Sequence, residues 1–203
     1  MDLTQSPAKN ASPVSSMIPC FLRGFFENPL KVASFVPSSG YLQAKLSSLP
    51  CLQTARNVVE LGPGTGATTS ALLNVLPENS NLLCIEVVSE FVNQLQQMTD
   101  ARLLVEEGSA LDLEAILRSN HMSAPDVIVS GVPFSVMSPD EGRHLIQSIH
   151  RVLAPGGTFV TYQFRSSVCE LAEDCFGAPQ RRSFILWNLP PLELYLWKKQ
   201  SDL

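Results

Sequence analysis

The stretch Val58-Val59-Glu60-Leu61-Gly62-Pro63-Gly64-Thr65-Gly66 decides the fold of this 203-residue chain. A short apolar run carries one acidic residue and passes directly into three glycines at alternate positions. Such a run is typical of a buried parallel strand, and residues 67–75 then have the pattern of a helix. Glycine permits the tight turn and lets the backbone approach a ligand closely. The stretch therefore predicts an open α/β sheet with a ligand site at the carboxyl end of its first strand.

The acidic residue in front of the glycines narrows the choice of ligand. The order Glu-x-Gly-x-Gly-x-Gly lacks the G-x-G-x-x-G spacing of dinucleotide sites and the Gly-Lys-Ser/Thr of a P-loop. A carboxylate here repels phosphate but attracts the ammonium group of a cationic ligand that has no phosphate. S-adenosylmethionine has this chemistry, so we expect it to contact the loop residues Glu60, Gly62, Pro63, Gly64, Thr65 and Gly66.

A second acidic residue, Glu86, ends the next apolar run, twenty-four positions after Gly62. A carboxylate at the end of the second strand of such a sheet can accept hydrogen bonds from both hydroxyl groups of a ribose. An ordinary surface glutamate at a strand end is the alternative. With the glycine loop before it, Glu86 and the adjoining Val87 are predicted to hold the ribose of the cofactor.

Composition excludes several classes of protein. The chain is long enough for one domain with a sizeable core, and no apolar stretch is long enough to span a membrane. No basic and apolar leader is present either, so we expect a cytoplasmic protein. The net charge is −5; residues 1–50 carry +2 (four Lys/Arg against two Asp/Glu) and the rest carries −7. An acidic domain is poorly suited to binding the phosphate backbone of a nucleic acid. The five cysteines lack the spacing of metal ligands, so no metal site is predicted.

The first 50 residues differ from the rest of the chain. Residues 1–16 are rich in Ser, Pro, Ala and Asn without periodicity, which predicts a disordered lead-in. Residues 17–50 form a predicted helical segment that covers the substrate or the membrane. One helix of this segment contains Phe21, Phe25 and Phe26 at helical spacing, and another begins at Asn28-Pro29. A third runs from Tyr41 to about Ser48, and residues 51–203 form the ligand-binding domain.

From residue 57 the chain alternates between strand and helix patterns. Strands are predicted at 57–61, 82–86, 102–106, 126–130 and 158–164, with helices at 67–76, 89–98, 111–119, 139–153 and 167–176. Two further strands, 183–187 and 192–197, are separated by only four residues, which is too short for a parallel crossover. The predicted fold is therefore a Rossmann-like, seven-stranded, mostly parallel sheet with an antiparallel last strand. Helices cover both faces, and an N-terminal helical extension precedes the sheet.

The chain resembles the small bacterial phospholipid N-methyltransferases, a class I S-adenosylmethionine-dependent family related to the rRNA adenine dimethyltransferases. The resemblance rests on the glycine loop and on several shorter segments: Phe21-Leu22-Arg23-Gly24-Phe25, Asn28-Pro29, Val36-Pro37-Ser38-Ser39, Val129-Ser130-Gly131-Val132-Pro133-Phe134, residues 153–159, and Asn188-Leu189-Pro190-Pro191. The glycine loop is widespread among methyltransferases, whereas the Ser-Gly-x-Pro and Pro-Ser-Ser segments are more selective.

The resemblance implies two further sets of site residues. Ser109 and Ala110 correspond to the segment that many methyltransferases place beside the adenine ring, with Ser109 where an acid usually stands. Either the Ser109 hydroxyl or the surrounding backbone then recognises the adenine. The segment Ser130, Gly131, Pro133 and Phe134 faces the transferred methyl group, and Gly131 replaces the amide side chain that adenine N6-methyltransferases carry there. Phe134 packs on the substrate, or alternatively is a loop aromatic that covers the core.

The family also implies the acceptor and a contact with the membrane. Its members methylate the amine of phosphatidylethanolamine, and residues 17–36 are expected to lie on the inner face of the cytoplasmic membrane. Alternatively, the aromatic residues there form a core helix on the sheet. Tyr41 is expected to close over the cofactor or the head group. Two other functions stay open: methylation of a soluble small molecule or rRNA, although a nucleic-acid partner is not expected, and a non-catalytic module that binds S-adenosylmethionine.

Overall fold

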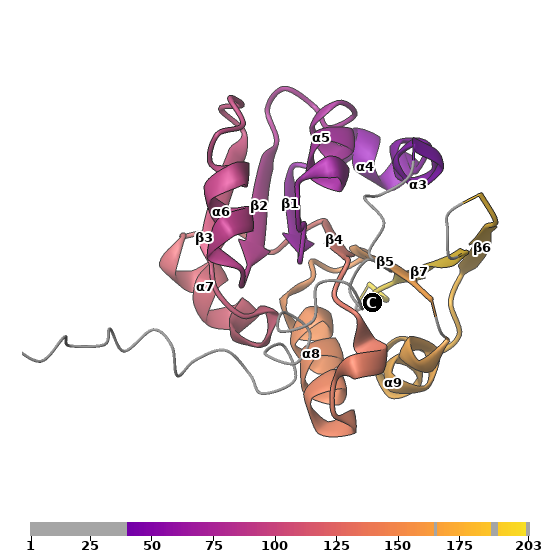
Figure 1. Cartoon of the computed structure of the whole chain (residues 1–203). Coiled ribbons are helices and arrows are strands. Elements are labelled where there is room, and N and C mark those ends of the chain that lie inside the picture. Colours follow the sequence, from indigo (N-terminus) through magenta and orange to yellow (C-terminus); the bar gives the residue numbers. More distant parts are fainter. Residues whose placement is uncertain (1–39, 165, 188–190, 202–203) are drawn as a thin grey trace, which may run out of the picture.

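The computed structural model describes residues 40–164, 166–187 and 191–201. The predicted lead-in and the helices expected within residues 17–36 lie outside this part of the chain. A seven-stranded sheet with the order β3-β2-β1-β4-β5-β7-β6 forms the centre (Figure 1). Its strands are β1 (Asn57–Leu61), β2 (Asn81–Glu86), β3 (Leu103–Glu107), β4 (Val127–Ser130), β5 (Thr158–Gln163), β6 (Arg181–Ile185) and β7 (Leu192–Lys198).

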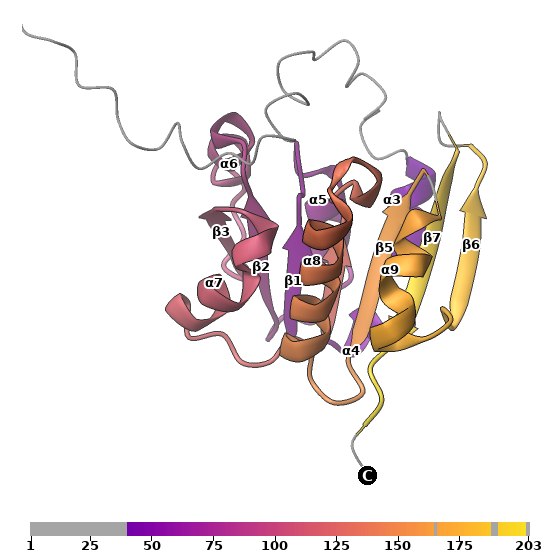
Figure 2. The ribbon, with the colours of Figure 1, turned by 90° about the horizontal axis from the view of Figure 1, so that it is seen from below.

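The strand directions confirm the predicted fold class. Strands β1 to β5 pair in parallel, and β7 runs antiparallel to both of its neighbours, β5 and β6. The order of the strands reverses after β3: β2 and β3 lie on one side of β1, and β4 and β5 lie on the other. Open α/β sheets bind ligands outside the carboxyl ends of the strands at such a switch point. The carboxyl ends of β1, β2 and β4 therefore mark the edge at which a site is expected; this is the upper edge of the sheet in Figure 2.

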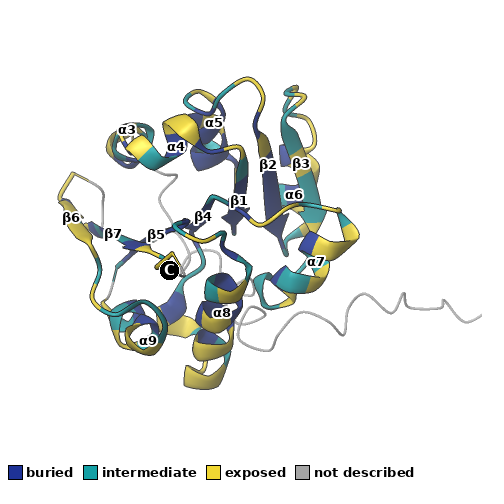
Figure 3. Ribbon diagram, turned by 180° about the vertical axis from the view of Figure 1, so that it is seen from behind, coloured by how far each residue is buried: buried dark blue, intermediate teal, exposed yellow. Residues whose placement is uncertain are grey.

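Helices cover both faces of the sheet, which explains the continuous apolar runs in its central strands. One face packs against α3 (Gly40–Ser47), α4 (Pro50–Thr54) and α5 (Ala67–Leu73), and the other packs against α7 (Leu113–Ser119), α8 (Pro139–Val152) and α9 (Ser167–Phe176). Helix α6 (Ser89–Leu95) follows β2 beside the edge strand β3. Buried residues, dark blue in Figure 3, fill β1 and the helix sides that face the sheet. Among the residues that the structure describes, no helix has the length and apolar composition that crossing a membrane requires.

Local sequence signals account for the start of α8. The Ser138 hydroxyl accepts a hydrogen bond from the Glu141 backbone N–H, and the Glu141 carboxylate accepts one from the Ser138 N–H. This capping box satisfies two N–H groups that the first turn of a helix leaves unpaired. Beyond it, Leu145, Ile146 and Ile149 repeat at helical spacing and are fully buried against the sheet.

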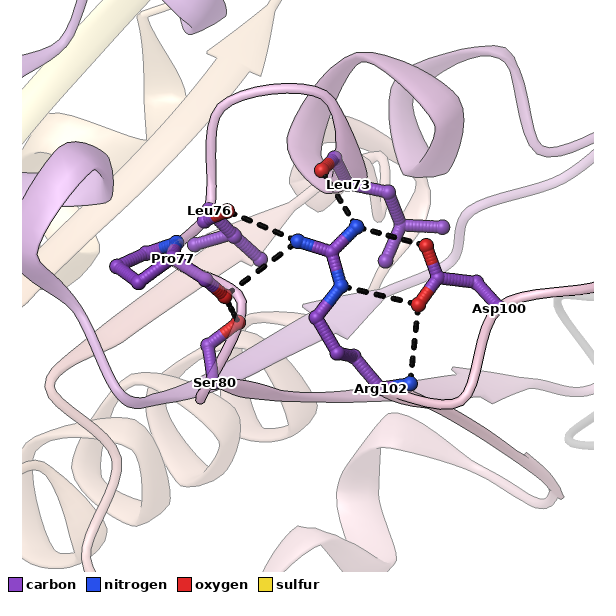
Figure 4. Close-up of polar contacts among 6 residues, drawn as sticks. All are labelled: Leu73, Leu76, Pro77, Ser80, Asp100 and Arg102. Carbon is purple, nitrogen blue, oxygen red and sulfur yellow. Dashed lines mark hydrogen bonds and ion pairs between the residues drawn. The ribbon is translucent and has the colours of Figure 1, made fainter.

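A guanidinium group fixes the turn that follows α5 (Figure 4). Arg102 donates hydrogen bonds to the backbone carbonyl oxygens of Leu73 and Leu76, each at 2.8 Å, and forms a two-pronged contact with Asp100 at 2.7 and 3.0 Å. The carbonyl groups at the end of a helix lack partners within the helix, so these bonds stabilise its last turn. The hydrogen bonds from Arg102 also lower the pKa of Asp100 to about 2.

Several details of the predicted secondary structure were wrong, among them the end of α6, which lies at Leu95 rather than at residue 98. Helix α5 ends at Leu73 rather than at residue 76, because Arg102 caps the carbonyls there. Helix α4 was not predicted; its Leu52 joins Leu42 and Leu46 of α3 in the same core cluster as the sheet. The core cluster of the sheet thus includes residues on both sides of residue 51. Strand β6 spans 181–185 instead of 183–187, because its ladder with β7 ends at the pair Ile185–Leu192.

Candidate active site

The glycine loop turns sharply between β1 and α5. Gly62, Gly64 and Gly66 have positive φ angles of 67°, 58° and 85°, which favour glycine over every other residue. The Gly62 N–H donates to the Ile85 carbonyl at 2.9 Å, so the loop is tied to β2. A Cβ on Gly66 would lie 2.9 Å from a Leu95 methyl group, whereas a Cβ on Gly64 would meet no atom within 4 Å. The backbone at Gly64 therefore faces open space, as close approach by a ligand requires.

The Glu60 side chain lies beneath this loop and is fully buried. Its carboxylate accepts hydrogen bonds from the hydroxyl groups of Thr68 and Thr69, the latter at 2.6 Å, and from the Cys84 thiol at 3.5 Å. Burial raises the pKa of Glu60, although these hydrogen bonds act in the opposite direction. The carboxylate thus links β1 to the first turn of α5 and supports the loop from inside. The sequence predicted a ligand contact at this position and did not reveal these partners.

Glu86 joins the end of β2 to the glycine loop. Its Oε1 accepts hydrogen bonds from the backbone N–H groups of Val87 (2.8 Å) and Val88 (3.0 Å), and its Oε2 accepts one from Gly64 (2.9 Å). A carboxylate oxygen has two lone pairs, so Oε2 can accept one further hydrogen bond. Burial raises the pKa of Glu86, while the backbone N–H groups lower it. A nearly buried acceptor beside the open glycine backbone fits a ligand that carries hydroxyl groups.

The segment predicted to lie beside adenine follows β3. The Gly108 N–H donates to the Glu86 carbonyl at 2.9 Å, which brings this segment next to the end of β2. The Ser109 hydroxyl accepts a hydrogen bond from the Leu111 N–H at 3.2 Å and caps the short 3-10 helix η2 (Ala110–Asp112). Its proton can still be donated to a ligand. The geometry thus brings Ser109 and Ala110 to the same edge as Glu86, and their contact with adenine stays a prediction.

The loop after β4 is held by a residue that the sequence did not single out. The Gln163 side chain donates to the Val132 carbonyl at 2.9 Å and accepts from the Phe134 N–H at 3.2 Å. Ser130 is fully buried, and its hydroxyl accepts from the Val132 N–H at 3.3 Å. Pro133 precedes the short 3-10 helix η3 (Phe134–Val136). No motif marks Gln163, because a polar residue late in a strand gives no sign of its burial.

Two aromatic residues of this region have contrasting environments. Phe134 is only 2% exposed and belongs to the core cluster under α8, as the alternative in which it covers the core expects. Tyr41 near the start of α3 is 58% exposed and stacks on Trp187, with ring centroids 6.3 Å apart. Trp187, which is 77% exposed, was not predicted as a site residue. The contact joins α3 to the end of β6, the edge strand of the sheet, and the closure of Tyr41 over the cofactor or head group stays a prediction.

The remaining predicted residues complete the same edge. The Gly131 N–H donates to the Leu61 carbonyl at 2.8 Å, so the segment after β4 lies beside the glycine loop. Within that loop Pro63 is buried and Thr65 is exposed. The donors and acceptors here are backbone groups, hydroxyls and the carboxylates of Glu60 and Glu86. In the described parts of the chain, no three His, Cys, Asp or Glu side chains come together as metal ligands would.

Comparisons with known proteins agree with this geometry. Residues 58–157 match the family model described as a methyltransferase domain. Over 142 residues the chain is 33% identical to an ornithine lipid N-methyltransferase of Singulisphaera acidiphila, in a match that covers 68% of this chain and 73% of that protein. The chain belongs to the class I S-adenosylmethionine-dependent methyltransferases. The enzyme class, an N-methyltransferase, and the cofactor expected from the sequence are thereby confirmed.

Other relatives of this methyltransferase act on different molecules. Ribosomal RNA small subunit methyltransferases A of a Burkholderia species and of Maricaulis maris are 31% and 33% identical over 106 and 100 residues. These matches cover 52% and 47% of the chain but only 38% and 33% of the relatives. Among solved structures, the N-methyltransferase NodS of Bradyrhizobium japonicum in complex with S-adenosylhomocysteine has a TM-score of 0.66. It is 16% identical, and the match covers 85% of this chain and 97% of NodS, which supports the fold.

Proposed function

We propose that this methyltransferase transfers methyl groups to the head-group amine of a membrane lipid, phosphatidylethanolamine or a related amino lipid. The observation that carries the proposal is the 33% identity to an ornithine lipid N-methyltransferase over most of both chains. The ribosomal RNA methyltransferases match a shorter part of the chain and about a third of their own length. The net charge of −5 also disfavours an RNA acceptor, since RNA binding depends on neutralising phosphates.

An exposed apolar surface near the carboxyl end of the edge strand β6 supports a lipid acceptor. We call Tyr41, Leu186 and Trp187 the aromatic rim; they are 58%, 70% and 77% exposed. Leu186 and Trp187 follow Ile185 at the carboxyl end of β6, which runs parallel to β1, so they lie toward the same edge as the glycine loop. Tyrosine and tryptophan suit the boundary between water and acyl chains, because each ring joins an apolar body to a polar group. Residues 17–36, outside the described part, are proposed as a second membrane contact.

In this proposal the chain binds and aligns two reactants. The glycine loop and Glu86 hold S-adenosylmethionine through the Gly64 backbone and a ribose hydroxyl, and Ser109 and Ala110 lie at its adenine. Glu60 positions the loop from beneath. S-adenosylmethionine supplies a methyl group on a positively charged sulfur. Transfer to a neutral amine is a direct displacement, so the protein contributes alignment of the nitrogen and exclusion of water.

The test offers the full chain labelled S-adenosylmethionine and vesicles of phosphatidylethanolamine in phosphatidylglycerol. We expect label in the lipid fraction. Replacing Leu186 and Trp187 together by serine should lower transfer to vesicles by about tenfold, because two apolar side chains no longer enter the lipid. Transfer to a short-chain, water-soluble phosphatidylethanolamine should stay within about twofold. Phe184→Ser is the matched control, because Phe184 lies on β6 just before Leu186 and Trp187 and is 62% exposed, but Arg182 stacks on its ring.

Two results would contradict the proposal in different ways. Cofactor binding without any labelled lipid would exclude the lipid acceptor and leave a soluble small molecule or rRNA. No cofactor binding at all would leave a non-catalytic domain. If the double substitution leaves vesicle activity unchanged, the aromatic rim does not contact the membrane, but the lipid acceptor is still supported.

A further inference from the structure

Gly131 leaves room for a side chain from another strand. A Cβ on residue 131 would lie 2.8 Å from the Gly62 carbonyl oxygen and 3.0 Å from Cζ of Tyr162, and closer still to the Tyr162 hydroxyl oxygen. Real Cβ atoms essentially never lie within 3.0 Å of such an atom, so the Gly62 carbonyl and the Tyr162 hydroxyl each exclude a side chain at residue 131. The Tyr162 hydroxyl thus occupies the space in which residue 131 would otherwise carry its own side chain.

The backbone on both sides of Tyr162 is fixed. Ser130 of β4 is in register with Thr161 of β5, and the Thr161 hydroxyl donates to the Ser130 carbonyl at 2.9 Å. On the other side, Gln163 binds the Val132 carbonyl at 2.9 Å. Tyr162 itself is half-buried and packs on the sheet face that α3 and α5 cover. Its hydroxyl oxygen is therefore held at the carboxyl ends of β1 and β4, next to the glycine loop.

We propose that the Tyr162 hydroxyl is a positioning group for the acceptor amine, and this inference rests on the proposed function. A neutral amine attacks through its lone pair, so its N–H groups must be held in other directions. The Tyr162 hydroxyl oxygen fills the space at Gly131, beside the Gly62 carbonyl oxygen, and both oxygens are able to accept hydrogen bonds from N–H groups. A hydroxyl can accept such a bond while donating its own proton elsewhere. Tyr162 thus takes the role of the amide that position 131 lacks.

The chemical step balances without a further reagent. The amine nitrogen forms a bond to the methyl carbon while the carbon–sulfur bond breaks, and the electron pair of that bond stays on sulfur. The product nitrogen is then positively charged. After the first or second methylation it releases one proton to water, and after the third it is a quaternary ammonium with no proton to release. A head group that already carries two methyl groups has no N–H as a neutral amine. Tyr162 can therefore orient the unmethylated head group but not the dimethylated one.

This difference between head groups distinguishes a positioning role of Tyr162 from a purely structural one. Tyr162→Phe and the wild-type enzyme are compared on vesicles whose ethanolamine head group carries zero, one or two methyl groups. Loss of one hydrogen bond should lower kcat by about tenfold on the unmethylated head group and by less than about twofold on the dimethylated one. Tyr195→Phe is the matched control, since its hydroxyl bonds Glu193 at 2.5 Å and its side chain packs in the cluster with α9.

The outcomes separate this inference from the proposed function. If Tyr162→Phe lowers transfer to all accepted head groups equally, or to none, Tyr162 is structural and the inference is wrong. If the wild type accepts the unmethylated head group alone, a loss in kcat at unchanged KM supports the inference, and a change in KM alone contradicts it. A wild type that methylates no lipid refutes both. Cofactor affinity from calorimetry and the thermal midpoint should match the wild type, because only one hydroxyl is removed.

Discussion

Replacing Glu86 by glutamine tests the cofactor site at the carboxylate that is proposed to bind the ribose. The oxygen of the amide is expected to take the place of Oε1, where it keeps the hydrogen bonds from Val87 and Val88. The amide NH₂ then replaces Oε2, faces the Gly64 N–H and cannot accept a ribose hydroxyl. A hydrogen bond to a charged acceptor contributes about 1.5–3 kcal/mol. The dissociation constant for S-adenosylmethionine should therefore rise roughly 10- to 150-fold.

Isothermal titration calorimetry of the full chain measures this change, with Glu170→Gln as the control. Glu170 is an exposed glutamate on α9, so its variant should bind like the wild type. Burial raises the pKa of Glu86, so its ionised form is lost at a higher pH than in an exposed glutamate. Wild-type affinity should accordingly weaken on acidification toward that raised pKa, and Glu86→Gln should not show this dependence. An affinity within threefold of the wild type, with the pH dependence intact, would refute the assignment of Glu86.

Three further substitutions test the scaffold of the site. Gly66→Ala should abolish cofactor binding and lower the thermal midpoint, because φ is 85° and its Cβ would lie 2.9 Å from a Leu95 methyl; Gly40→Ala, with no atom within 4 Å, should do neither. Arg102→Met should lower the free energy of unfolding in urea by about 1–3 kcal/mol, because carbonyl groups lose their donors. The pKa of Asp100 is lowered from 3.8 to about 2, so the wild type should lose the stability that this ion pair contributes as the pH falls between these values. Equal acid sensitivity of the wild type and Arg102→Met would contradict this role of the ion pair. Gln163→Leu should lower kcat and lower the free energy of unfolding by about 1–3 kcal/mol, because the Val132 carbonyl and the Phe134 N–H lose their partner. Unchanged unfolding in urea would show that water replaces the Gln163 side chain.

Local sequence patterns were sufficient to predict most of the sheet. The runs that became β1, β2 and β4 are apolar because helices bury both of their faces, and such runs are recognisable without knowledge of their partners. The three glycines and Glu86 were predictable for a similar reason. Each meets a requirement of its own short segment, a positive φ or an acceptor at a strand end.

Contacts between distant segments could not be predicted in this way. Gln163 holds a loop about thirty residues earlier in the chain, and the position of Tyr162 is set by the register of β5 on β4. Trp187 is exposed because the ladder of β6 ends two residues earlier, a boundary that depends on β7. Glu60 was predicted from its place before the glycines, but its partners Thr68 and Thr69 meet it only after α5 folds back onto the strand.

One measurement can decide whether this site methylates a lipid amine. The purified full chain is given labelled S-adenosylmethionine together with total lipid, total RNA and small metabolites in one mixture, and the label in each fraction is counted. We expect label in lipids with an amine head group, and much less of it with Glu86→Gln when the cofactor concentration is below the dissociation constant of that variant. Label in RNA or in small metabolites, with none in lipid, would contradict it.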